Sequence, residues 1–171
     1  MKNYIFITGG AGYIGSFTAK ILNEYGYNTI VYDDLSNGHK NAIPKHSIFI
    51  KGDIGDYKKL NHIFTKYKIK VIIHFAGKII AEESVKNPAE YFKNNVVKGI
   101  NLLNSAVKSK IKYFIYSSSA GIYGISKKSP IKENFPKKPV NPYGTTKLIF
   151  EQILESYKNS YGLNYISLRY F

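Results

Sequence analysis

The glycine-rich segment of residues 9–15 constrains the fold of this chain more than any other feature. It reads Gly-x-Gly-x-x-Gly at Gly10, Gly12 and Gly15, and Gly-x-x-Gly-x-x-Gly when counted from Gly9. An apolar run precedes it and a segment with helical spacing follows it. Glycines in this context allow a tight turn and a close approach to a pyrophosphate, and the helix N-terminus offers N–H groups to the anion. The segment therefore predicts a dinucleotide-binding turn.

Short apolar runs alternate with helical segments along the rest of the chain. We expect strands at residues 4–8, 29–32, 47–51, 71–75, 113–118 and 165–170. We expect helices at residues 14–25, 58–67, 88–109 and 142–161, and a loop near the site at residues 124–141. Apolar strands buried on both faces, connected by right-handed helical crossovers, form a parallel sheet. The expected fold is α/β, a Rossmann-type doubly wound parallel sheet of about six strands in one domain, residues 1–171.

Charge and arginine content bear on the class of partner. The chain carries 25 lysines and arginines against 11 acidic residues, which gives a formal net charge of +14. This suggests an anionic partner, although a codon bias towards lysine explains the same composition. Arg169 is the only arginine, whereas arginine is the residue preferred for recognising phosphates and bases. We therefore expect no nucleic-acid partner.

Other features of the composition exclude several classes of site. The chain has no cysteine, which excludes disulfides and thiolate metal ligands and fits a reducing cytoplasm. Its four histidines show no metal-binding spacing, so no metal site is expected. No apolar run approaches the ~20 residues of a membrane span. We expect a cytoplasmic protein without membrane contact.

Two acidic residues follow the second expected strand. Asp33 lies 18 residues after Gly15, close to the ~20 residues expected for a carboxylate that bonds an adenosine ribose. Asp34 follows it, and no arginine lies nearby to hold a 2′-phosphate. These residues favour NAD over NADP, and an ordinary turn role for Asp33 is the alternative.

A tyrosine, a lysine and three serines carry the pattern of a redox site. Tyr143 and Lys147 are four residues apart at the start of an expected helix, and so share one face. An ammonium beside a phenol favours the phenolate, which makes a tyrosine usable as a base near neutral pH. Ser117, Ser118 and Ser119 end the fifth expected strand, where ligands bind in open α/β sheets. A serine there is able to share a proton with Tyr143; the alternative is a polar strand end without chemistry.

The chain resembles the extended short-chain dehydrogenase/reductase family, and within it the UDP-glucose 4-epimerase branch, over its whole length. The matching motifs are TGGAGYIGS at 8–16, GDI at 52–54, HFAG at 74–77, ESV at 83–85, NNV at 94–96, SSSAGIYG at 117–124, PYGTTK at 142–147 and LRYF at 168–171. One departure follows Gly77, where the family often has Leu-Lys-Ala-Val and this chain has Lys78-Ile79-Ile80-Ala81. Lys78 either serves a similar need one place earlier or marks a variant lineage.

The resemblance implies roles for matching residues. Tyr143 is expected to be the catalytic base, Lys147 its electrostatic partner and Ser119 the hydroxyl that aids proton transfer. A cofactor-binding role is expected for Gly9, Gly12, Tyr13, Ile14, Gly15, Asp33, Asp34, Asp53, Ile54, Phe75, Ala76, Gly77, Asn94, Ser117, Tyr143, Lys147 and Tyr170.

The implied reaction is NAD-dependent epimerisation at C4 of a UDP-hexose through transient oxidation to a 4-keto sugar. Related 4,6-dehydratases carry Thr-Asp-Glu where this chain has Ser119-Ala120-Gly121, which argues against dehydration because eliminating water needs an extra acid/base pair. A UDP-glucuronate epimerase or decarboxylase, or a non-catalytic NAD-binding fragment, remain alternatives. With the last residue at Phe171, we expect the family's C-terminal substrate domain to be absent. A homodimer is expected of the full-length family.

Overall fold

The computed structural model describes residues 2–126 and 128–171, so Lys127, in the expected site loop, lies outside the described residues. Its centre is a parallel sheet in the order β3-β2-β1-β4-β5-β6. The strands are β1 (Asn3–Thr8), β2 (Asn28–Asp33), β3 (Ile48–Lys51), β4 (Lys68–His74), β5 (Tyr113–Ser119) and β6 (Asn164–Tyr170). The expected α/β fold is therefore confirmed. Because the strand order reverses between β1 and β4, a ligand-binding crevice is expected beyond the carboxyl ends of these two strands.

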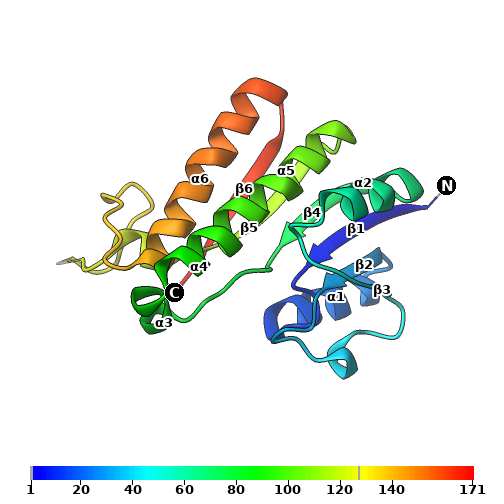
Figure 1. Cartoon of the computed structure of the whole chain (residues 1–171), viewed down its shortest axis with the longest axis horizontal. Coiled ribbons are helices and arrows are strands. Elements are labelled where there is room, and N and C mark those ends of the chain that lie inside the picture. The colour runs from blue at the N-terminus through cyan, green and yellow to red at the C-terminus, as the bar shows by residue number, and fades with distance from the viewer. Residues whose placement is uncertain (1, 127) are drawn as a thin grey trace.

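Helices cover the two faces of the sheet unequally. The α-helices are α1 (Tyr13–Glu24), α2 (Tyr57–Lys66), α3 (Ala81–Lys86), α4 (Pro88–Phe92), α5 (Lys98–Lys108) and α6 (Pro142–Tyr161), with short 3₁₀ turns η1 (Lys40–Ala42) and η3 (Ala120–Tyr123). Figure 1 shows α2, α5 and α6 on one face and α1 on the other. On the face of β6 that none of the described helices covers, Ile166, Leu168 and Tyr170 are between 39% and 58% exposed.

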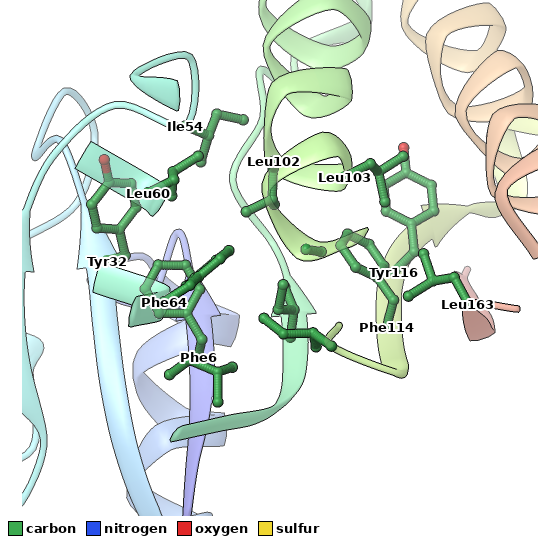
Figure 2. Packing of buried hydrophobic residues seen from close by; sticks show 14 of the residues in the cluster. Phe6, Tyr32, Ile54, Leu60, Phe64, Leu102, Leu103, Phe114, Tyr116 and Leu163 are labelled. Atoms are coloured by element: carbon green, nitrogen blue, oxygen red, sulfur yellow. The ribbon is translucent and has the colours of Figure 1, made fainter. Parts of the chain in front are cut away.

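The larger hydrophobic core lies between the sheet and the three helices α2, α5 and α6 (Figure 2). The Phe6 ring lies 5.3 Å from the Tyr32 ring and 5.0 Å from the Phe64 ring, centroid to centroid. A smaller cluster beneath α1 contains Ile7, Val31 and their neighbours. Because successive strand residues alternate between these two layers, the central strands are apolar at nearly every position.

The region expected as one helix at 88–109 has a different internal structure. It comprises α4, a π-helical turn at Lys93–Val97 and α5. A π turn accommodates an extra residue, so it rotates the side chains that follow relative to a regular helix. Helical spacing in the sequence does not reveal such an insertion, and the short helix α3 was not expected either.

The described residues provide neither a membrane-spanning helix nor a cluster of metal ligands. None of their helices is both long and apolar enough to cross a bilayer. Histidine, aspartate and glutamate side chains do not gather in groups of three or more that suit a metal ion within the described part of the chain.

Candidate functional site

The glycine turn joins β1 to α1 at the strand reversal. Gly9 has φ +68°, and a Cβ atom there would lie 2.6 Å from the Ala76 nitrogen, so only glycine fits both the backbone and the space. A Cβ atom at Gly15 would lie 2.3 Å from the Gly9 oxygen, which explains why α1 can start so close to the turn. By contrast, a Cβ atom at Gly12 would meet only the Gly9 oxygen, at 3.3 Å. Gly12 therefore borders open space, as a turn that receives a pyrophosphate requires.

The N-terminus of α1 is free to bind an anion. Gly12 is its N-cap residue, no side chain caps it, and its first turn holds no acidic residue. The first turn begins with Tyr13 and Ile14, whose side chains are exposed. Backbone N–H groups at an uncapped helix start, together with the helix dipole, attract a phosphate. This position fits the cofactor-binding role expected of both residues.

Asp33 links the end of β2 to the glycine turn. Its carboxylate accepts hydrogen bonds from the Ala11 nitrogen at 2.9 Å and the Leu35 nitrogen at 2.8 Å, and the residue is buried. The exposed Asp34 instead accepts two bonds from Ser36. Asp33 therefore both stabilises the turn and lies at the crevice. The two roles are compatible, because a carboxylate can accept more hydrogen bonds than the two made here.

Phe75, Ala76 and Gly77 follow β4, and backbone atoms of Phe75 and Ala76 lie against Gly9 of the glycine turn. The Phe75 nitrogen donates to the Thr8 oxygen at 3.0 Å. Below this contact, Thr8 Oγ1 and His74 Nδ1 are joined at 2.7 Å across β1 and β4. Burial, with a smaller effect from the charge of Lys147, lowers the pKa of His74 to about 3, so the imidazole is neutral. His74 therefore supports the floor of the crevice.

Asp53 and Ile54 follow β3, and their side chains lie in different environments. Burial raises the pKa of Asp53, but hydrogen bonds from Lys98 Nζ and the Gly55 nitrogen outweigh it and hold the pKa below its usual range. The Ile54 side chain is buried in the larger core. Only backbone atoms of Ile54 are therefore available for the expected contact with an adenine.

Tyr143 and Lys147 share the first two turns of α6. Asn141 begins this helix by accepting a hydrogen bond from the Gly144 nitrogen at 2.8 Å. The Lys147 ammonium is buried, donates to the Ser117 oxygen at 2.6 Å and lies 5.7 Å from the centroid of the Tyr143 ring. Burial lowers the pKa of Lys147 to about 8. The expected tyrosine–lysine pair is thus brought together, with a backbone carbonyl holding the lysine in place.

The three serines that end β5 face different partners. Ser118 is buried and donates to Glu151 Oε1 at 2.7 Å, so it belongs to the core. Ser119 Oγ accepts a bond from the Gly121 nitrogen at 3.0 Å. A Cβ atom at Gly121 would lie 3.3 Å from Ser119 Oγ and 4.0 Å from Tyr143 Cε1, so both side chains border the same small space. Of the three serine side chains, that of Ser119 is the one beside Tyr143.

Tyr170 and Asn94 complete the expected set. Tyr170 pairs in register with Ser119 at the edge of the sheet and is 41% exposed. Asn94 lies in the π turn and donates to Asn95 Oδ1 at 3.1 Å. Lys78 Nζ donates to Glu83 Oε1 at 3.2 Å, so its ammonium is engaged next to α3.

Asn95 is a buried residue of the site that sequence reasoning missed. Its Oδ1 accepts from the Lys78 nitrogen at 2.8 Å, and its Nδ2 donates to the Lys78 oxygen at 2.9 Å and to Thr146 Oγ1 at 3.2 Å. Thr146 in turn donates to the Tyr143 oxygen. Asn95 thus connects the loop after β4 to the helix that carries Tyr143. The only sign of this residue in the sequence is the pair Asn94-Asn95. Hydrophobic periodicity does not show whether such a pair is buried or exposed to solvent.

A second missed cluster surrounds the only arginine. Arg169 donates to both Glu151 carboxylate oxygens at 2.9 Å, and to the Tyr123 hydroxyl at 2.6 Å. Glu151 also accepts from Ser118 and lies 3.4 Å from Lys137 Nζ. Burial raises the pKa of Glu151, but the bonds from Arg169 and Ser118 outweigh it and lower the pKa. These contacts tie β5, β6 and α6 to the loop that follows η3.

The residues around the crevice fit a bound dinucleotide. The glycine turn leaves space at Gly12, the start of α1 is uncapped, and the Asp33 carboxylate lies beside the turn at the end of β2. Across the strand reversal, Tyr143, Lys147 and Ser119 lie together at the carboxyl end of β5. The arrangement combines an uncapped helix start, which suits an anion, with a tyrosine–lysine pair beside a serine hydroxyl.

The chain is similar in sequence to curated UDP-glucose 4-epimerases. It is 43% identical over 170 residues to the UDP-glucose 4-epimerase of Rhizobium meliloti, a match that covers 99% of this chain and 52% of that protein. It is 44% identical over 167 residues to that of Lacticaseibacillus casei, covering 98% of this chain and 50% of that protein. The chain thus spans about half the length of the curated relatives it matches.

Solved structures give the same relationship. UDP-glucose 4-epimerase from Brucella ovis in complex with NAD has a TM-score of 0.96 at 44% identity, covering 99% of this chain and 52% of that one. The Thermotoga maritima enzyme with UDP-glucose has a TM-score of 0.94 at 36% identity, covering 98% and 55%. The sequence model of the NAD dependent epimerase/dehydratase family matches residues 5–171. The expected family and its NAD dependence are therefore confirmed, and this chain belongs to the NAD dependent epimerase/dehydratase family.

Proposed function

We propose that this chain binds NAD and carries the catalytic residues of a UDP-hexose 4-epimerase, with Tyr143, Lys147 and Ser119 at the reacting end. The observation that carries the proposal is the Tyr143–Lys147 pair, held beside Ser119 at the carboxyl edge of the sheet and across the strand reversal from the glycine turn. The complexes of similar enzymes with NAD, UDP and UDP-glucose support this choice of cofactor and substrate class.

The residues of the glycine turn bind and orient the cofactor. The N–H groups at the start of α1 bond the pyrophosphate, and Asp33 bonds the adenosine ribose while it also fixes the turn through the Ala11 nitrogen. Phe75, Ala76 and Gly77 form the opposite wall. Bound NAD supplies hydride chemistry, and the protein supplies position and proton transfer.

The residues of α6 and β5 handle the proton of the sugar 4-hydroxyl. Tyr143 Oη accepts this proton and returns it after the sugar has presented its other face. The positive charge of Lys147, next to the Tyr143 ring, favours the phenolate. Ser119 Oγ bonds the same sugar hydroxyl and aligns it with Tyr143. Tyr170, in register with Ser119, lies beside the nicotinamide end.

Two assays on the purified chain distinguish a catalytic role from a non-catalytic NAD-binding role. The purified chain is assayed for bound NAD by absorbance and fluorescence, and for conversion of UDP-galactose to UDP-glucose. NAD bound with conversion is the expected result. NAD bound without conversion would reject the enzymatic role of this chain, which spans about half of its relatives, and retain a non-catalytic NAD-binding role. No NAD binding would reject both.

The choice of sugar is tested in the same assay. UDP-galactose, UDP-glucuronate and UDP-N-acetylglucosamine are compared at equal concentration, because 4-epimerases for different sugars occur among the similar structures. We expect the highest kcat/KM with UDP-galactose. A higher value with UDP-glucuronate would assign the chain to the uronate branch instead.

A further inference from the structure

A cleft of about 720 Å³ lies between α1 and the segment of residues 41–46. Of the residues that line it, only Tyr13 belongs to the proposed cofactor site; Asp33, Tyr143 and Lys147 do not line it. In Figure 1, α1 and this segment lie on the side of the sheet opposite α2, α5 and α6. The cleft is therefore distinct from the crevice in which the proposed chemistry occurs.

Two aromatic rings on one face of α1 are exposed at this cleft. The Tyr13 side chain is 91% exposed and that of Phe17 is 61% exposed. Residues four apart on a helix are neighbours, so the two rings form one apolar surface. Ile43 and Pro44 line the facing wall. Apolar surface in a concave site is typical of a place where a ligand binds.

The walls of the cleft are fixed by hydrogen bonds on both sides of residues 41–46, within the connection between β2 and β3. Near its end, Ser47 Oγ accepts from Asn23 Nδ2 at 2.9 Å and is joined to Thr29 Oγ1 at 2.7 Å, which ties the segment to α1 and β2. Before residues 41–46, the His39 nitrogen donates to the Ala11 oxygen at 2.9 Å. A cleft with anchored walls loses little conformational entropy when a ligand binds.

The charged side chains that line the cleft are mainly positive. They are Lys20 and Lys45, against the single acidic residue Glu24. Glu24 lies 3.9 Å from Lys20 Nζ, so Lys20 compensates its charge and Lys45 is left to attract an anion. The volume falls within the roughly 300–1,000 Å³ that is usual for small-molecule sites.

We propose that this cleft is a second ligand site, which takes a small aromatic anion. The ring of the ligand packs on Phe17 and Tyr13, and its negative group lies near Lys45. This combination distinguishes the ligand from a neutral apolar molecule, which gains nothing from the lysine, and from a simple anion, which gains nothing from the rings.

The test uses 8-anilinonaphthalene-1-sulfonate, an aromatic anion whose fluorescence rises on binding, titrated into the chain saturated with NAD. We expect one probe to bind per chain. Phe17→Ser removes the ring on which the probe packs, and is expected to weaken binding about tenfold or more. Lys45→Glu is expected to weaken it by a similar factor through charge repulsion. The neutral analogue N-phenyl-1-naphthylamine is expected to bind more weakly than the anion.

Matched controls separate the cleft from general effects. Tyr25→Ser removes an exposed ring at the end of the same helix, and Lys112→Glu reverses an exposed charge elsewhere; neither residue lines the cleft. Both should leave probe affinity within about twofold of the unchanged chain. Unchanged NAD binding and thermal unfolding in Phe17→Ser and Lys45→Glu show that these variants fold. The proposal is overturned if the probe fails to bind, if NAD displaces it, if the neutral analogue binds equally well, or if the cleft variants bind like the controls.

Discussion

The Lys147 ammonium lies 5.7 Å from the centroid of the Tyr143 ring while it donates a 2.6 Å hydrogen bond to the Ser117 carbonyl oxygen. The same ammonium lies 5.0 Å from the centroid of the Tyr116 ring, so two aromatic faces and one carbonyl replace its hydration. These contacts offset the loss of water only in part, so burial lowers the pKa of Lys147 to about 8. A buried cation is thereby held beside the phenol that it is proposed to activate.

The lowered pKa of Lys147 predicts a distinctive pH dependence of stability. Between pH 8 and the ordinary lysine value of 10.5, the folded chain binds fewer protons at this site than the unfolded chain does. The free energy of unfolding therefore rises with pH in this window, by up to about 1.4 kcal/mol per pH unit from this group. Lys147→Met removes the contribution. Urea unfolding of both proteins at pH 7.5, 8.5 and 9.5 measures it.

The exposed Lys112 provides the control for this measurement. Lys112→Met should keep the same slope of stability against pH as the unchanged chain. If Lys147→Met also keeps that slope, the ammonium is not perturbed in the folded chain, and the electrostatic argument for the pair loses its basis.

Removal of one oxygen from Tyr143 tests the proposed base. Tyr143→Phe keeps the ring against Lys147 but cannot accept a proton, so turnover of UDP-galactose should fall by about 10²–10⁴-fold, the usual contribution of acid–base catalysis. NAD binding, measured by fluorescence titration, should stay within about twofold because the glycine turn is untouched. Turnover at the original rate would assign the proton transfer to another group.

The strands and the two ends of the crevice could be predicted from the sequence for a physical reason. A central strand in a parallel sheet is buried on both faces, so Phe6 and Ile7, which pack into opposite layers, are both apolar. The glycines at 9 and 15 are required by backbone contacts below 3 Å, which leaves a readable pattern. Constraints of this kind involve residues close together in the sequence, so the sequence pattern reveals them.

Features that depend on distant contacts could not be predicted in this way. The direction of the Ile54 side chain follows from the packing of α2 and α5 against the sheet, and nothing near residue 54 reveals it. The partners of Asn95 are 17 and 51 residues away in the sequence. The scarcity of arginine argues only against a nucleic-acid partner, and nothing near residue 169 reveals that Arg169 donates to a carboxylate 18 residues earlier.

Asn95 is predicted to be essential to the stability of the site. Asn95→Ala leaves the partly buried Lys78 nitrogen and oxygen without their side-chain partner, and each such group costs about 1–3 kcal/mol. A loss of about 2–4 kcal/mol in the free energy of unfolding is expected, measured by urea titration without cofactor. Asn94→Ala, which removes one bond at a half-buried residue, should cost less than about 1 kcal/mol. Equal losses in the two variants would contradict the central role of Asn95.

His74 is predicted to make the chain sensitive to acid. Its pKa is about 3 in the folded chain and 6.5 ordinarily, so the unfolded chain binds more protons here between these values. Stability is therefore lost as the pH falls below 6.5, by up to about 1.4 kcal/mol per pH unit from this group. His74→Asn keeps an acceptor for Thr8 Oγ1 but does not titrate. Its unfolding free energy should change less between pH 6.5 and 4.5 than that of the unchanged chain, and parallel profiles would refute the assignment.

The Glu151–Arg169 pair makes the last prediction, because its two members should behave very differently alone and together. Glu151→Leu leaves the Arg169 guanidinium without the carboxylate that holds two of its nitrogens, and breaking a buried pair in this way costs about 3–5 kcal/mol.

Adding Arg169→Met to Glu151→Leu removes the unpaired charge and replaces it with an apolar side chain of similar length, so most of the lost stability should return. Thermal and urea unfolding of the two single variants and the double variant, arranged as a double-mutant cycle, measure the coupling. Additive losses would show that Glu151 and Arg169 act independently, and would leave the anchoring of β6 to α6 to apolar packing alone.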